Sequence, residues 1–156
     1  MIRVLFVCLG NICRSPMAEA VMRDIVKSEG LEKEIMVDSA GTGNWHIGNP
    51  PHEGTRSILE KQEIEYEGMK ARQVIQDDLF DFDYIIAMDG ENLGNLHRLA
   101  GYNKTGVIKR LLDYVPEAGQ DDVPDPYFTG NFEEVYEMVK SGCENLLNTI
   151  KETHQL

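Results

Sequence analysis

Five residues separate a cysteine from an arginine near the start of the chain, in the segment CLGNICRS that spans Cys8 to Ser15. A backbone ring of that length fits around an object the size of phosphate, and a loop at a helix N-terminus presents free N–H groups to an anion. Arg14 can grip an oxyanion with two donors. Because the same donors stabilise a thiolate, we expect Cys8 to be an ionised nucleophile able to attack phosphorus.

Two alternative roles for Cys8 are less well supported. Cysteine is common at the end of a buried strand, but Arg14 and Ser15 at this spacing favour a reactive thiolate. A zinc site would need further ligands, and no Cys-x2-Cys or His-x3-His pair lies near Cys8 and Cys13. We therefore expect neither a metal nor another cofactor.

The composition is that of a globular protein of one domain, expected to cover residues 1–156. The net charge of −12 argues against nucleic acid and anionic membranes as partners. Three cysteines do not close a disulfide framework, so a reducing cytoplasm is expected. No apolar stretch approaches the roughly 18 residues that span a bilayer. We expect a cytoplasmic monomer.

The hydrophobic pattern alternates between strands and helices, which predicts βαβ units and the α/β fold class. We expect a four-stranded parallel sheet in the order 2-1-3-4 with helices on both faces, a flavodoxin-like three-layer sandwich. The expected strands are 2–7, 35–39, 84–88 and 107–112. The expected helices are 16–28, 53–62, 91–99 and 131–153, with a helical turn over 76–80 and a long loop over 113–130.

The first strand and helix define where the chemistry should lie. Ser15 is the predicted N-cap and Pro16 the predicted first helical residue. In parallel sheets a ligand lies beyond the C-terminal ends of the strands. Cys8, Ser39 and Asp89 all end or follow predicted strands, so we expect them to meet at one edge of the sheet.

The segment from Cys8 to Glu19, CLGNICRSPMAE, resembles the signature of the low-molecular-weight protein tyrosine phosphatases. The likeness extends over essentially the whole chain, and the further stretches in the family's order and spacing are Asp38–Thr42, Lys70–Arg72, Met88-Asp89 and Asp125–Tyr127. The resemblance implies a two-step reaction in which Cys8 attacks a phosphoester in line and forms a phosphocysteine, which water then hydrolyses.

Asp125 matches the family's general acid, which gives a proton to the leaving phenolate and later activates water. The residues themselves agree, since Asp125 lies in a Pro-Asp-Pro turn within an acid-rich stretch that should favour its protonated form. Asp121 and Asp122 are expected to be solvated. Asp89 is interpreted as a turn residue at a strand end or a partner for loop backbone.

The resemblance also implies a set of residues that bind the substrate and hold the loop. Polar members would fix the loop and thiolate, although Ser39 is also typical of a turn. Aromatic members would flank a phosphotyrosine ring, although Trp45 could instead anchor the core. The expected substrate-binding residues are Leu9, Gly10, Asn11, Ile12, Cys13, Ser15, Ser39, Trp45, Tyr127 and Phe128.

Two positions carry open questions. Cys13 either pairs reversibly with Cys8 under oxidation or packs as a small hydrophobe. Many relatives have histidine where this chain has Met69, so a polar support of the loop is missing or replaced. Cys143, on the apolar face of the last helix, is expected to be buried.

Three related activities compete with phosphotyrosine hydrolysis. Arsenate reductases of this fold need further cysteines, and residues 14–142 contain none. Protein arginine phosphatases carry threonine where Ile12 stands. A cysteine phosphoryl-carrier domain would lack Arg14, Ser15 and Asp125. We therefore expect phosphotyrosine-containing proteins as substrates, with inorganic phosphate or other oxyanions as product or inhibitor.

Overall fold

The computed structural model describes residues 1–156 and contains one parallel sheet in the order β2-β1-β3-β4. This confirms the expected strand order. Central strand β1 pairs with β2 through Phe6 and Ser39 and with β3 through Phe6 and Ile86. The strands are β1 (Ile2–Cys8), β2 (Ile35–Gly41), β3 (Tyr84–Ala87) and β4 (Val107–Arg110).

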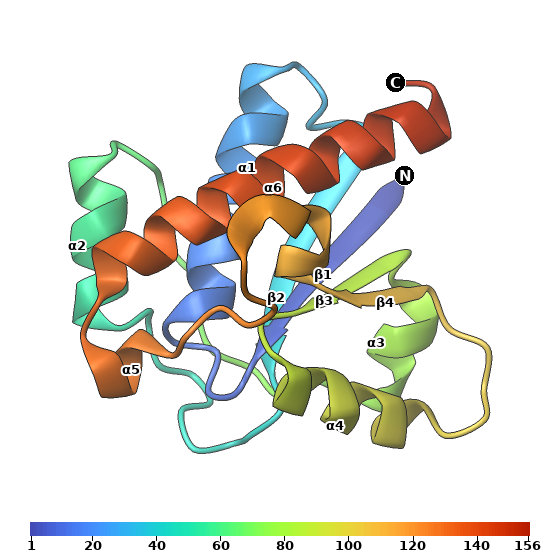
Figure 1. Cartoon of the computed structure of the whole chain (residues 1–156), viewed down its shortest axis with the longest axis horizontal. Helices are drawn as coiled ribbons and strands as arrows, with labels where there is room; N and C mark the ends of the chain where they lie inside the picture. Colours follow the sequence, from blue (N-terminus) through green and yellow to red (C-terminus); the bar gives the residue numbers. More distant parts are fainter.

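Helices cover both faces of the sheet, as Figure 1 shows. Because side chains alternate along a strand, Val4 and Phe6 point into the large core beneath α1 and α6, whereas Leu5 and Val7 point into a smaller core beneath α3 and α4. The three layers are confirmed. The helices are α1 (Arg14–Ser28), α2 (Glu53–Lys61), α3 (Gln76–Asp81), α4 (Gly90–Ala100), α5 (Pro126–Thr129) and α6 (Phe132–His154).

The first helix begins two residues earlier than predicted. Cys13 is the N-cap and α1 begins at Arg14, so the prediction of Ser15 as N-cap and Pro16 as first helical residue is wrong. Proline is tolerated in the first turn because N–H groups there have no intrahelical acceptor. This shift places the Ser15 side chain inside the fold instead of at a helix cap.

The predicted fourth strand and the loop after it also differ from the structure. β4 ends at Arg110, and Leu111 starts a short 3₁₀ helix, η1 (Leu111–Tyr114), followed by η2 (Pro116–Ala118). Leu111 is fully buried against α6, where a Cβ on Gly142 would lie 2.4 Å from its Cγ. This close packing turns the chain out of the sheet.

No helix combines the length and apolar character needed to cross a membrane.

Candidate active site

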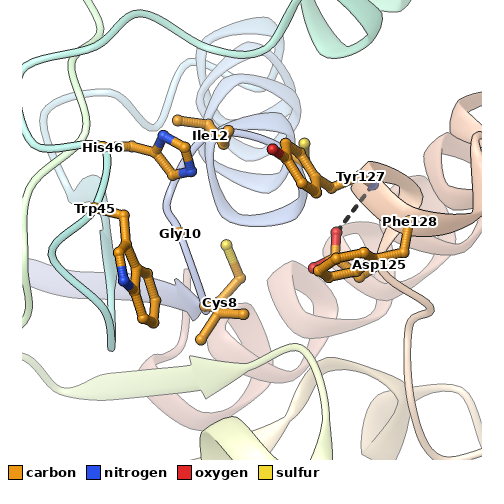
Figure 2. A pocket seen from close by; sticks show the side chains of 10 residues that line it. Cys8, Gly10, Ile12, Trp45, His46, Asp125, Tyr127 and Phe128 are labelled. Carbon is orange, nitrogen blue, oxygen red and sulfur yellow. Dashed lines mark hydrogen bonds between the residues drawn. The ribbon is translucent and has the colours of Figure 1, made fainter.

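A cavity of about 240 Å³ opens at the C-terminal end of β1. Three segments form it: the loop from β1 to α1, the turn after β2, and the segment that leads into α5. Figure 2 shows Trp45 and His46 facing Tyr127 and Phe128 across the opening, with Cys8 between them. The lining residues are Cys8, Leu9, Gly10, Ile12, Cys13, Trp45, His46, Asp125, Tyr127 and Phe128.

Most residues singled out in the sequence therefore lie around one cavity, although they come from three distant segments. The other four, Asn11, Arg14, Ser15 and Ser39, are buried behind the cavity wall. His46 was not among the expected binding residues. Its place in the glycine-rich turn beside Trp45 was the one signal available in the sequence.

The cysteine loop, residues 8–14, is held from behind by Asn11. Its backbone has a φ of +56°, a left-handed conformation that asparagine tolerates better than most residues. Its side-chain oxygen accepts from the backbone N–H of Arg72 at 2.9 Å, and its amide donates to Ser15 Oγ at 2.8 Å and Ser39 Oγ at 2.9 Å. These contacts are all internal, so they fix the loop without a ligand.

Ser15 connects this support to the nucleophile. Its Oγ lies 3.0 Å from Sγ of Cys8. Because Asn11 already donates to that oxygen, the hydroxyl hydrogen of Ser15 is available to an acceptor, and Sγ of Cys8 at 3.0 Å is closer than the carbonyl of Ala40 at 3.5 Å. The serine can therefore stabilise a thiolate, a role that requires it to lie in the first helical turn and not at the cap.

Glu19 provides a polar contact to Ser39 behind the cysteine loop, whereas the Met69 side chain makes no hydrogen bond there. Ser39 Oγ donates to Glu19 Oε1 at 2.6 Å, and Arg23 donates to the other carboxylate oxygen. Burial raises the pKa of Glu19, while the hydrogen bond from Ser39 and the charge of Arg23 act to lower it. Met69 packs against the large core. Glu19 belongs to the signature segment Cys8–Glu19, but its contact with Ser39 was not predicted from the sequence.

The backbone of the cysteine loop is prepared for an anion. None of the N–H groups of residues 9–13 donates to another atom of the protein. Buried N–H groups are nearly always paired, and Asn11, Ile12 and Cys13 are buried. Together with the N-terminus of α1, these donors form a cradle of the kind that binds oxyanions.

Arg14 is almost fully buried at the inner end of the cradle. Its Nη1 donates to Asp89 Oδ2 at 2.7 Å and to the carbonyl of Val123 at 2.9 Å, and its Nε has no partner in the protein. Burial acts to lower the pKa of Arg14, but the negative charges of Cys8, Asp89 and Asp125 raise it above its ordinary value. The guanidinium thus stays charged, with its Nε–H and one N–H of Nη2 free for a ligand.

Asp125 lies on the opposite side of the cavity from the cysteine loop. It is the N-cap of α5, where Oδ1 accepts from the backbone N–H of Tyr127 at 3.1 Å (Figure 2), and Oδ2 lies 3.4 Å from Arg14 Nη2. Its partners in the structure are thus the N–H group of Tyr127 and the guanidinium of Arg14.

Aromatic side chains form the rim. Trp45 is 67% exposed and Phe128 is 74% exposed, so neither anchors the core. The indole lies over Gly43, where an added Cβ would stand 1.8 Å from the ring. Large exposed aromatic side chains around a pocket are typical of a binding site. A flat apolar group can lie between these side chains and reach the cradle with an attached oxyanion.

Two histidines and Phe132 buttress the rim, which the sequence did not reveal. His52 caps α2 through its ring nitrogen, stacks on Phe132 at 5.2 Å between ring centroids and meets the edge of Tyr127 at 5.8 Å. The ring centroids of His46 and Tyr127 lie 6.2 Å apart. The α5 segment is therefore packed against α2 and α6 through aromatic contacts.

Cys13 is buried and lines the same cavity as Cys8. Burial, followed by the negative charges of Cys8 and Asp125, raises the pKa of Cys13 to about 12. Its thiol is therefore protonated at neutral pH. Cys143 is fully buried on α6, as expected, and burial raises the pKa of its thiol as well.

Sequence comparison identifies similar proteins over nearly the full chain. Residues 3–156 match the model of a family described as low molecular weight phosphotyrosine protein phosphatase. The chain is 63% identical over 156 residues to low molecular weight protein-tyrosine-phosphatase YfkJ of Bacillus subtilis, with 100% of both chains covered. It is 51% identical over 150 residues to PtpA of Staphylococcus epidermidis, which covers 96% of this chain and 94% of that protein.

Solved structures show the same likeness in three dimensions. The crystal structure of YfkJ from Bacillus subtilis has a TM-score of 0.96 at 63% identity and covers 98% of this chain and 96% of that chain. The structure of DARP, a drosophila arginine phosphatase, has a TM-score of 0.89 at 34% identity and covers 97% of this chain and 98% of that chain. The similarity therefore extends over the sheet and all its connections.

Proposed function

This chain belongs to the low molecular weight phosphotyrosine protein phosphatase family, and on that premise we propose that it hydrolyses phosphotyrosine in proteins through a phosphocysteine at Cys8. One observation carries the residue assignment. A cysteine with a hydroxyl partner, an unpaired set of backbone donors and a carboxylate meet at one cavity, and a buried arginine contacts that carboxylate from behind the wall. This combination provides a nucleophile, an oxyanion cradle and a proton donor for one phosphoester.

The first step transfers the phosphoryl group to sulfur. The thiolate of Cys8 attacks phosphorus in line, the bond to the phenolic oxygen breaks, and Asp125 gives its proton to that oxygen. The N–H groups of residues 9–13 and Arg14 bind the three remaining oxygens, whose charge spreads in the transition state. Asp125 is left as a carboxylate.

The second step regenerates the enzyme. Asp125 takes a proton from water, which attacks the phosphocysteine, and inorganic phosphate leaves as the sulfur recovers its electron pair. Inorganic phosphate should therefore also inhibit as a competitive ligand of the cradle. Ser15 lowers the free energy of the thiolate that leaves in this step, since its hydroxyl lies 3.0 Å from Sγ.

The rim supports an aromatic substrate. Trp45, Tyr127 and Phe128 offer ring faces to the phenyl group of phosphotyrosine. Ile12 also lines the cavity and presents only hydrocarbon there. An apolar side chain at this position suits a phenyl ring better than the charged guanidinium of phosphoarginine.

The free thiols of Cys8, Cys13 and Cys143 support a reducing compartment such as the cytoplasm. Contiguous cores on the two faces of one sheet support residues 1–156 as a single domain. The monomeric state proposed from the sequence is checked by the molar mass in solution.

Phosphoarginine hydrolysis is the second candidate, because a drosophila arginine phosphatase has the same fold. One peptide sequence carrying either phosphotyrosine or phosphoarginine separates the two, with arsenate reduction as a further arm. We expect kcat/KM to favour phosphotyrosine, and Ile12→Thr to reduce that preference. Preferred hydrolysis of phosphoarginine by the unchanged protein would overturn the proposed specificity.

A further inference from the structure

The segment that carries Asp125 is fixed to the sheet at Val123. The backbone N–H of Val123 donates to the carbonyl of Met88, at the end of β3, at 2.9 Å. Its carbonyl accepts from Arg14 at 2.9 Å, and its side chain is fully buried. We call residues 120–125 the acid loop. The position of the acid loop relative to the cradle thus depends on contacts of residues that precede Asp125 in the chain.

A second attachment of the acid loop comes from Asp122. Its Oδ1 accepts from the backbone N–H of Gly90, the first residue of α4, at 2.9 Å. Arg110 Nη1 lies 3.9 Å from the same oxygen. The carboxylate therefore lies at the positive end of a helix and beside a cation, both of which favour its bound position. The side chain is 57% exposed, as expected of a solvated residue, and it also makes this contact with α4.

The same end of α4 also receives Asp89, which caps it and holds Arg14. Two carboxylates at one helix end thus hold Arg14 and the loop that carries Asp125. Asp89 fixes the arginine, and Asp122 fixes the loop that ends in Asp125. Because Asp122 directly precedes Val123, loss of its carboxylate leaves Val123 as the remaining attachment between the sheet and the proton donor, and the loop can then shift about that single point.

We propose that Asp122 is a positioning residue that places Asp125 for proton transfer to the leaving group. This proposal rests on the proposed phosphatase function. A general acid must lie within hydrogen-bond reach of the oxygen that it protonates, and a displacement of about 1 Å lowers the rate strongly. Asp122 does not line the cavity, so any effect on the reaction must pass through other residues, and we assign that effect to Asp125.

The test compares Asp122→Ala with the matched control Asp121→Ala. Asp121 is 78% exposed and lies 4.0 Å from Arg110, without a hydrogen bond to α4. The measured quantity is kcat/KM, which reports formation of the phosphocysteine, for phenyl phosphate and for a phosphate ester with a very acidic phenol. We expect Asp122→Ala to lose about tenfold on phenyl phosphate and less than about twofold on the activated ester.

Three further measurements separate positioning from a general structural effect. Asp122→Asn keeps an oxygen for Gly90 and should recover most of the lost rate. The inhibition constant for inorganic phosphate should stay unchanged, since the cradle is intact. With Asp125→Ala already present, Asp122→Ala should add almost no further loss, because both changes act on one proton transfer.

The outcomes are distinct. Equal losses on both esters, weakened phosphate inhibition, or full additivity with Asp125→Ala would overturn the role of Asp122. Wild-type rates in Asp122→Ala would do so as well, while leaving the phosphatase function intact. Failure of the unchanged protein to hydrolyse either ester would instead contradict the proposed function.

Discussion

Arg14 and Asp89 form a buried ion pair, with Nη1 2.7 Å from Oδ2. The other oxygen of Asp89 accepts from the backbone N–H of Asn92 at 2.8 Å, so one carboxylate joins the cysteine loop to the first turn of α4. Arg14 is 3% exposed and Asp89 is 21% exposed, which shields the pair from water. Removing one partner of such a pair leaves the other charge without compensation.

Asp89→Asn tests this ion pair with little disturbance of the helix. The amide oxygen still caps α4, but the charge that orients Arg14 is lost. We expect the inhibition constant for inorganic phosphate to rise roughly tenfold, and thermal unfolding to occur at a lower temperature because Arg14 loses a compensating charge. Asp89→Ala should lower the unfolding temperature further, because it also removes the cap of α4. If neither substitution changed the inhibition constant for inorganic phosphate, Asp89 would have no role in orienting Arg14.

Asp125→Ala removes the proposed proton donor. General acid catalysis contributes about 10²-fold or more, so we expect a loss of that size in kcat/KM for phenyl phosphate. An ester with a very acidic phenol needs no proton and should be spared. Rates for a series of substituted phenyl phosphates provide the measurement. A similar loss along the whole series would point to a different acid.

The cysteines should differ sharply in reactivity. Cys8 lies in the open cavity beside anion-binding donors, whereas the pKa of Cys13 is raised to about 12 and Cys143 is fully buried. Iodoacetate at about pH 8 should therefore label Cys8, and inorganic phosphate should slow the reaction. Peptide mass spectrometry locates the label. Labelling of Cys13 at a comparable rate would contradict the protonated state of its thiol.

Glu19 should make stability depend on pH in a defined direction. Burial raises the pKa of Glu19 above its ordinary value of 4.5 in the folded protein, so protonation favours the folded state. The stabilisation that comes from the protonated carboxyl group is complete below about pH 4.5 and is lost as the pH rises through the raised pKa. In Glu19→Gln the side chain cannot ionise, so the free energy of unfolding does not contain this loss.

Urea unfolding of both proteins between about pH 4 and pH 8 checks this prediction. The free energy of unfolding of the unchanged protein, minus that of Glu19→Gln, should fall as the pH rises above 4.5. The Gln side chain retains an acceptor for Ser39, so the lost contacts add a constant offset. A difference that grows with pH would show that the hydrogen bonds from Ser39 and Arg23 outweigh burial.

Much of the fold could be predicted because the strands are strongly apolar and the helices strongly periodic. The continuous apolar run in β1 indicates burial on both faces, which the cores around Val4 and Leu5 confirm. The start of α1 was misplaced because serine before proline is a typical cap pattern. In the fold, the tertiary contact of Ser15 with Cys8 outweighs that local preference.

The sequence predicted most of the residues that face the cavity and the loop supports Asn11, Ser15 and Ser39, but not the contacts of Asp89 and Asp122. Cys8, Arg14 and Asp125 carry reactive groups that their sequence surroundings reveal. Asp89 and Asp122 act through contacts with residues 75 and 32 positions away, and no local pattern encodes such distances. A carboxylate at a helix end looks the same in the sequence whether it meets water or a buried guanidinium.

A rapid-quench experiment tests the central claim most directly, since it asks which atom carries the phosphoryl group during turnover. The protein is mixed with phenyl phosphate, quenched under denaturing conditions within one turnover and digested for mass spectrometry. We predict one phosphoryl group on the peptide that contains Cys8, and none in Cys8→Ser, which should still bind inorganic phosphate. A phosphoryl group on another residue, or continued turnover by Cys8→Ser, would contradict the assignment of Cys8 as the nucleophile.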